Sequence, residues 1–87
     1  NMNKIKILSP IALDTNWTAV TIPDKVRYSI SFQLESLGVL FFSFDGGATS
    51  MKVVGTGETL FGNFSNRVIY FKCNDGTDNL QIRTQDA

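Results

Sequence analysis

The side chains that could carry catalysis are few in this chain and do not form a recognisable set. Its 87 residues include no histidine, the side chain that most often acts as a general base near neutral pH. Cys73 is the one cysteine and ends the apolar run Arg67–Cys73, which favours a buried packing role over that of a nucleophile. Ser29, Ser31 and Ser43 lie inside expected strands and lack the sharp turn that exposes a nucleophilic serine. We therefore expect a protein that is not an enzyme.

The acidic residues fall mostly at expected turns. Asp75 and Asp78 could offer oxygen ligands to calcium, but the sequence around them lacks the run of alternating ligands of a calcium loop. Aspartate also caps its own turn, and we favour this simpler role. Glu35 and Glu58 could form a glycosidase pair, although nothing else in the sequence supports that chemistry. We predict no metal site and no cofactor.

Charge and composition narrow the kinds of partner. Eight basic and eight acidic residues give a formal net charge of zero, and no basic cluster is present, so we expect no nucleic-acid partner. No stretch is apolar enough over a sufficient length to span a bilayer, so we expect no membrane partner. A domain of this size has a thin core, and one cysteine without histidine offers neither an internal disulfide nor a common zinc site. Oligomerisation is the remaining way for so small a domain to gain stability.

The elements that would position any functional residue are strands, of which Val26–Glu35 is the clearest. Apolar and polar residues alternate along its whole length. A period of two is typical of a strand with one face on a core and the other in water. The residues expected to face the core are Val26, Tyr28, Ile30, Phe32 and Leu34.

The rest of the chain resembles a set of partners for this strand, separated by turn residues. We expect further strands at Lys4–Leu8, Trp17–Ile22, Val39–Phe44, Thr49–Val54, Arg67–Cys73 and Asp78–Thr84, and a short strand or plug near Leu60–Phe64. No helical stripe, repeat or linker is present. The prediction is an all-β protein, a single antiparallel β-sandwich domain over residues 1–87 with seven or eight short strands, either jelly-roll or Ig-like.

Two strands are apolar on both faces. If Leu40, Phe42 and Phe44 face the core, then Val39 and Phe41 point away from it, and Val68 and Tyr70 do the same in the strand that ends at Cys73. Monomers rarely expose such a patch without a use. Either a second subunit covers it or the segment Leu60–Phe64 folds over it, and the sequence leaves both open. We predict Val39, Phe41, Val68 and Tyr70 as an interface.

A sugar platform is the alternative use of exposed aromatic rings. Trp17 and Tyr70 combine an apolar face with a polar edge, which suits stacking on a sugar ring. Phenylalanine predominates among the aromatic residues, however, and core packing accounts for most of it. A carbohydrate-binding β-sandwich module is therefore our alternative hypothesis.

The chain from Ser31 onward resembles a pattern shared by small structural proteins of tailed bacteriophages. The matching segments are S-F-Q-L-E-S at 31–36, F-F-S-F-D-G-G-A-T-S at 41–50, G-T-G-E-T-L at 55–60 and V-I-Y-F-K-C-N-D-G-T at 68–77. Val53 and Val54 before Gly55 depart from the small-residue loop usual there. The resemblance covers about two thirds of the chain and offers no catalytic residues to carry over.

The resemblance implies a virion component, as capsid decoration, head fibre or tail part, made in the bacterial host cytoplasm. It also implies a homo-oligomer, first of all a trimer, bound to another virion protein.

Overall fold

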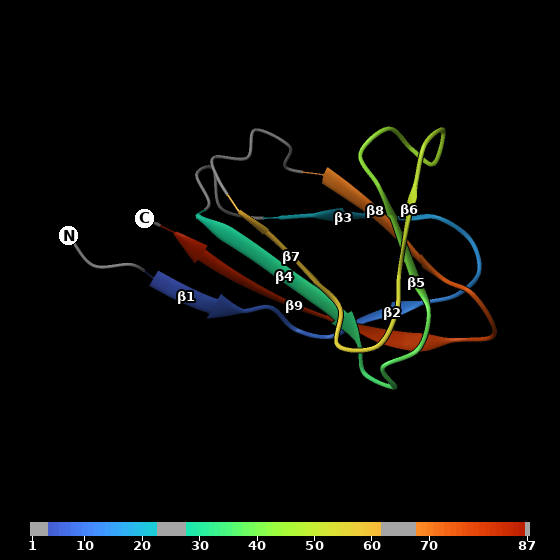
Figure 1. The fold of residues 1–87 in the computed structure, drawn as a ribbon, viewed down its shortest axis with the longest axis horizontal. Helices are drawn as coiled ribbons and strands as arrows, with labels where there is room; N and C mark the ends of the chain where they lie inside the picture. Colours follow the sequence, from blue (N-terminus) through green and yellow to red (C-terminus); the bar gives the residue numbers. More distant parts are fainter. Residues whose placement is uncertain (1–3, 23–27, 62–67, 87) are drawn as a thin grey trace.

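The computed structural model describes residues 4–22, 28–61 and 68–86, and these ranges contain strands and no helix (Figure 1). The all-β prediction is confirmed. Within these ranges no helix is therefore available to cross a membrane. The strands are β1 (Lys4–Ile7), β2 (Ile11–Leu13), β3 (Thr18–Thr21), β4 (Ser29–Leu34), β5 (Leu40–Ser43), β6 (Met51–Val53), β7 (Glu58–Phe61), β8 (Val68–Cys73) and β9 (Asp78–Asp86).

The strands form two packed antiparallel sheets (Figure 1). The first has the order β1-β9-β4-β7, with β2 also paired to β9, and the second has the order β3-β8-β5-β6. The chain thus pairs as nested couples: β1 and β2 with β9, β3 with β8, β4 with β7, and β5 with β6. This is the double-sheet arrangement of a jelly roll. An Ig-like order, which groups strands A, B, E and D against C, F and G, does not fit.

The strand β2 was not predicted from the sequence. It explains why the structure has more strands than the seven or eight expected. Pro10 has no N–H to donate to a ladder, so β1 ends before it, as the sequence predicts. Pairing with β9 resumes immediately afterwards, with Ile11 opposite Leu80. Between the two segments, the Leu8 amide donates to the Ile82 carbonyl at 2.9 Å, which keeps the chain against β9.

The core lies between the sheets, and the alternation in β4 sets its centre. Ile30, Phe32 and Leu34 are each at most 2% exposed, which confirms the predicted inward face. The Phe32 ring meets Phe42 and Phe71 of the other sheet edge-on, with centroids 4.9 and 5.1 Å apart. Such aromatic pairs add to the gain from burial alone and tie the two layers together.

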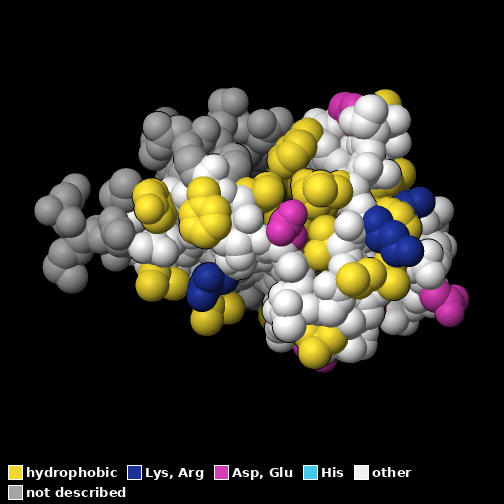
Figure 2. Space-filling view, viewed as in Figure 1, with side chains coloured by type: hydrophobic (Ala, Val, Ile, Leu, Met, Phe, Trp, Pro, Cys, Tyr) yellow, Lys and Arg dark blue, Asp and Glu magenta, His cyan; other side chains and the backbone are white. Residues whose placement is uncertain are grey.

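Two residues expected in the core are exposed instead. Tyr28 precedes β4 and is 51% exposed, with its ring edge-on to Phe61. Phe44 is 42% exposed because β5 ends at Ser43 and the chain turns there. Val26 lies outside the described residues. Figure 2 shows hydrophobic side chains gathered over β7 and the β5–β6 hairpin, where both sheets have an edge strand.

Candidate functional site

A row of aromatic and lysine side chains crosses the outer face of the second sheet. Phe41 of β5 lies opposite Lys72 of β8, and Thr18 lies opposite Phe71, so Trp17 flanks Lys72 on the other side. The Lys72 Nζ sits 4.9 Å from the Trp17 ring centroid and 5.4 Å from that of Phe41. One ammonium group therefore makes cation–π contacts with two rings. We call Trp17, Phe41, Tyr70 and Lys72 the aromatic face.

The predicted interface residues meet on or beside this face. Tyr70 lies between Ala19 and Ser43 in the row next to Lys72, on the side of β8 away from the core. Val68 shares that side and is 38% exposed. Val39 precedes β5 and is half-buried, and its carbonyl accepts a hydrogen bond from the Asn74 amide at 3.1 Å. The predicted interface and the predicted sugar platform thus fall on one surface.

The β5–β6 hairpin beside this face is held by one carboxylate. Asp45 accepts hydrogen bonds from the Ser43 hydroxyl at 2.7 Å, the Thr49 amide at 2.9 Å and the Thr49 hydroxyl at 2.6 Å. These bonds, with that of the Thr49 hydroxyl the largest cause, lower the pKa of Asp45 from 3.8 to about 2. The Gly47 amide also donates to Ser43 Oγ at 2.9 Å. Hydrogen bonds within the turn therefore fix where Gly47 lies.

Gly47 packs directly against the indole ring of Trp17. Its φ is 102°, a conformation that favours glycine, and a Cβ added there would overlap the indole ring. The hairpin turn thus closes against one side of Trp17 while Lys72 lies over the ring. The indole is partly buried.

The segment Leu60–Phe64 was one of the two candidates to cover the outer apolar patch, and its described residues lie in the other sheet. Leu60 and Phe61 belong to β7, which pairs with β4 in the first sheet. Leu60 packs against the core, and Phe61 is 71% exposed. The suggestion that these two residues fold over the aromatic face is therefore wrong. Phe64, the third residue of that suggestion, lies outside the described residues.

The titratable groups near the sheet ends have structural partners. Cys73 is buried, burial raises the pKa of its thiol, and the thiol donates to the Gly76 carbonyl at 3.5 Å. Asp78 accepts a hydrogen bond from the Ser36 hydroxyl, and this bond is the main reason its pKa is lowered. Across the ranges that the structure describes, no three His, Cys, Asp or Glu side chains are grouped to hold a metal.

No known protein family, curated protein or solved structure matches this chain. The resemblance to bacteriophage structural proteins therefore stays a prediction. The case for function depends on the fold and on the surfaces of the molecule.

The sequence interpretation missed the lysines of this surface. Lys72 follows Tyr70 by two residues and so shares its side of the strand, which the alternation alone predicts. Lys52 lies opposite Phe41 on the same outer face and is exposed, but its place depends on the pairing of β5 with β6. The charge on this surface is therefore positive, and its partner must accommodate that charge.

Proposed function

We propose that this protein is a non-enzymatic structural and interaction protein that forms a homo-oligomer through its aromatic face. The observation that carries the proposal is the grouping of Trp17, Phe41 and Tyr70 on the outer side of a sheet, away from the shared core. Burying a large apolar side chain fully stabilises a contact by about 1.5–3 kcal/mol, and these half-buried rings offer part of that. Repeated around a symmetric assembly, such contacts support a stable interface.

The best-supported setting for such a protein is a bacteriophage virion. Jelly-roll domains recur in viral capsids and in lectins, so the fold is compatible with this role without determining it. The resemblance of the segments from Ser31 onward to phage structural proteins points the same way. In this proposal the protein is made in the bacterial host cytoplasm and binds another virion protein. Its detection in purified phage particles by mass spectrometry is the direct test.

The charge on the face favours a ring over a two-fold dimer. A two-fold contact brings the same patch of both copies together, so the positive charges of Lys52 and Lys72 from both copies would share one interface. A ring contact joins two different patches and avoids this repulsion. A trimer is the oligomer that we propose first, because the resemblance to phage structural proteins implies one.

Light scattering of the wild type and of a Phe41→Glu, Tyr70→Glu double variant tests the interface. We expect an oligomeric wild type and a folded monomeric variant, because two carboxylates would be placed in every contact. The matched control is Ile5→Glu with Ile7→Glu, two exposed apolar residues of β1 in the other sheet, which should leave the oligomer intact. A folded wild-type monomer at high micromolar concentration contradicts the proposal, and so does a double variant that keeps the oligomer.

The carbohydrate-binding alternative at Trp17 and Tyr70 finds less support in the geometry. Lys72 lies over the Trp17 ring and Gly47 approaches it, so part of the indole surface that a sugar would use is already covered. Saturable quenching of Trp17 fluorescence by a neutral sugar is the result that would favour this alternative.

A further inference from the structure

A groove of about 470 Å³ lies on the outer face of the first sheet, on the opposite side of the sandwich from the aromatic face. Its polar lining includes Ser31, Gln33, Thr59, Gln81 and Arg83. Strand alternation turns these side chains outward, since their neighbours Phe32 and Ile82 face the core. The volume falls within the range of about 300–1,000 Å³ typical of small-molecule sites.

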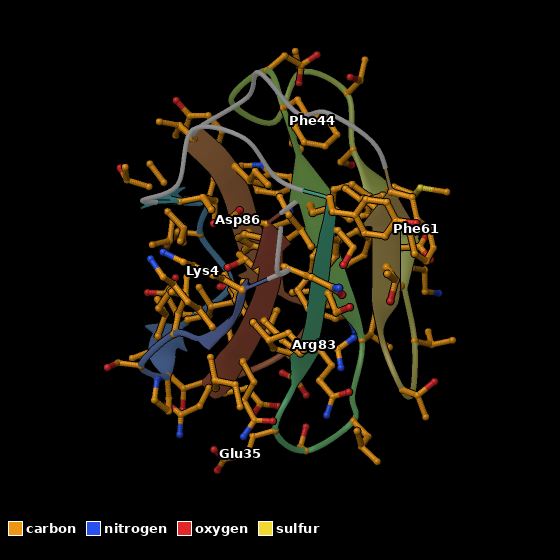
Figure 3. All side chains as sticks on the ribbon, turned by 90° about the vertical axis from the view of Figure 1, so that its left-hand side faces the viewer. Lys4, Glu35, Phe44, Phe61, Arg83 and Asp86 are labelled. Atoms are coloured by element: carbon orange, nitrogen blue, oxygen red, sulfur yellow. The ribbon has the colours of Figure 1, made fainter. Side chains whose placement is uncertain are left out.

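Three of these side chains form a hydrogen-bonded row across three strands. Arg83 of β9 lies opposite Ser31 of β4, which lies opposite Thr59 of β7. Arg83 Nη2 donates to Ser31 Oγ at 3.1 Å, and Ser31 Oγ is 2.9 Å from Thr59 Oγ1. Figure 3 shows Arg83 beside β4 in the view toward this end of the molecule. The row holds the guanidinium in place through a neutral partner.

The guanidinium lacks a carboxylate partner in the described part of the chain. No described carboxylate forms an ion pair with Arg83, and its hydrogen bond goes to a hydroxyl. Glu58 also lines the groove, but it lies opposite Phe32, so alternation turns its side chain toward the core side of β7. Arg83 is therefore the charged group on the outward lining, and it has N–H donors left for a ligand.

We propose that this groove binds an acidic saccharide, with the sugar carboxylate on Arg83. A guanidinium binds a carboxylate through two parallel hydrogen bonds, which gives both strength and orientation. The hydroxyls of Ser31 and Thr59 and the carboxamides of Gln33 and Gln81 can both donate and accept, as neighbouring sugar hydroxyls require. Ile7 and Pro10 provide an apolar wall for the C–H face of the ring. An acidic peptide could also place a carboxylate on Arg83, and a peptide probe in the test below distinguishes the two.

Calorimetric titration with 3′-sialyllactose, trigalacturonate, lactose and triglutamate tests the proposal. We expect binding of at least one acidic saccharide and at least tenfold weaker binding of lactose, the neutral match to sialyllactose. The two acidic probes distinguish a sialic from a uronic acid. Binding of neither acidic saccharide overturns the proposal, and equal binding of triglutamate replaces it with a peptide site.

Variants locate the site. Arg83→Gln should weaken binding about tenfold to a hundredfold, the usual value of a charge-assisted hydrogen-bonding pair, and Arg83→Lys should give an intermediate loss. Lys52→Gln removes the same charge from the opposite sheet and should change affinity less than about twofold. Equal losses in the Arg83→Gln and Lys52→Gln variants would indicate general charge attraction and overturn the proposal, as would unchanged binding in Arg83→Gln. Amide shifts in the wild type should map to β4 and β9 and spare Trp17, which separates this result from the oligomer proposal.

Discussion

Asp45 is the residue in which local hydrogen bonding has the clearest consequence for the molecule. Its carboxylate accepts bonds from Ser43 and Thr49 and so fixes the turn between β5 and β6. The same turn brings Gly47 against Trp17 on the aromatic face. Protonation of one exposed carboxyl group therefore acts on the surface that we propose as the interface.

The pKa of Asp45 predicts a loss of stability in acid. A carboxyl group whose pKa is lower in the folded than in the unfolded chain stabilises the fold above its unfolded pKa, and this contribution falls as the pH drops through the folded pKa. The loss should occur between about pH 4 and pH 2, since folding lowers this pKa from 3.8 to about 2. In thermal melts, Asp45→Asn should lower the melting temperature at pH 7 and have a much smaller effect at pH 2. Asp75→Asn makes the same charge change in the β8–β9 hairpin and serves as control. An effect of Asp45→Asn that is independent of pH would contradict the prediction.

The strand β4 contributes to both the core and the outer face of the first sheet. It pairs with β7 on one side and β9 on the other, its inward residues form the centre of the core, and its outward Ser31 joins the groove. A shift of one residue in its register would exchange these two faces. Fold and groove therefore depend on the same alternation.

Charges placed on neighbouring residues of β4 should have opposite outcomes. Ile30→Asp buries an unpaired carboxylate at a position that is 0% exposed and should cost more than about 4 kcal/mol, enough to prevent folding. Ser31→Asp adds a carboxylate on the wet face beside Arg83 and should change stability by less than about 1 kcal/mol. Circular dichroism and urea unfolding measure both. Equal melting of the two variants would show that the inward register is wrong.

At the scale of the whole molecule, the two sheets share one core. Ile69 of β8 and Ile82 of β9 come from different sheets, are almost fully buried, and belong to the same hydrophobic cluster. Neither sheet has a separate core among the described residues. The sandwich should therefore unfold as one unit.

Core truncation in either sheet should shift the same transition. Ile69→Ala and Ile82→Ala should each lower the free energy of unfolding by about 2–5 kcal/mol, the usual cost of removing these methyl groups and leaving a cavity. Urea unfolding followed by Trp17 fluorescence and by far-ultraviolet circular dichroism should give coincident curves in both variants. Curves that separate would show that the sheets unfold independently.

The candidate surfaces differ in how far the sequence predicts them. Phe41 and Tyr70 were predicted to face outward from the two-faced pattern of their strands, and Lys72 follows from the same alternation. The groove could not be predicted in this way. Arg83 and Ser31 are far apart in the sequence, and only the pairing of β9 with β4 makes them neighbours.

The sequence by itself determined the fold class and the inward face of each long strand, because a period of two acts through local geometry that every strand shares. The tertiary structure decided the jelly-roll order, the resumption of pairing after Pro10 and the exposure of Phe44. These depend on which strands meet and where each one ends. β9 meets β1, β2 and β4 through contacts between distant parts of the chain. Many strand orders satisfy the same alternation, so only the packing of all strands around one core selects among them.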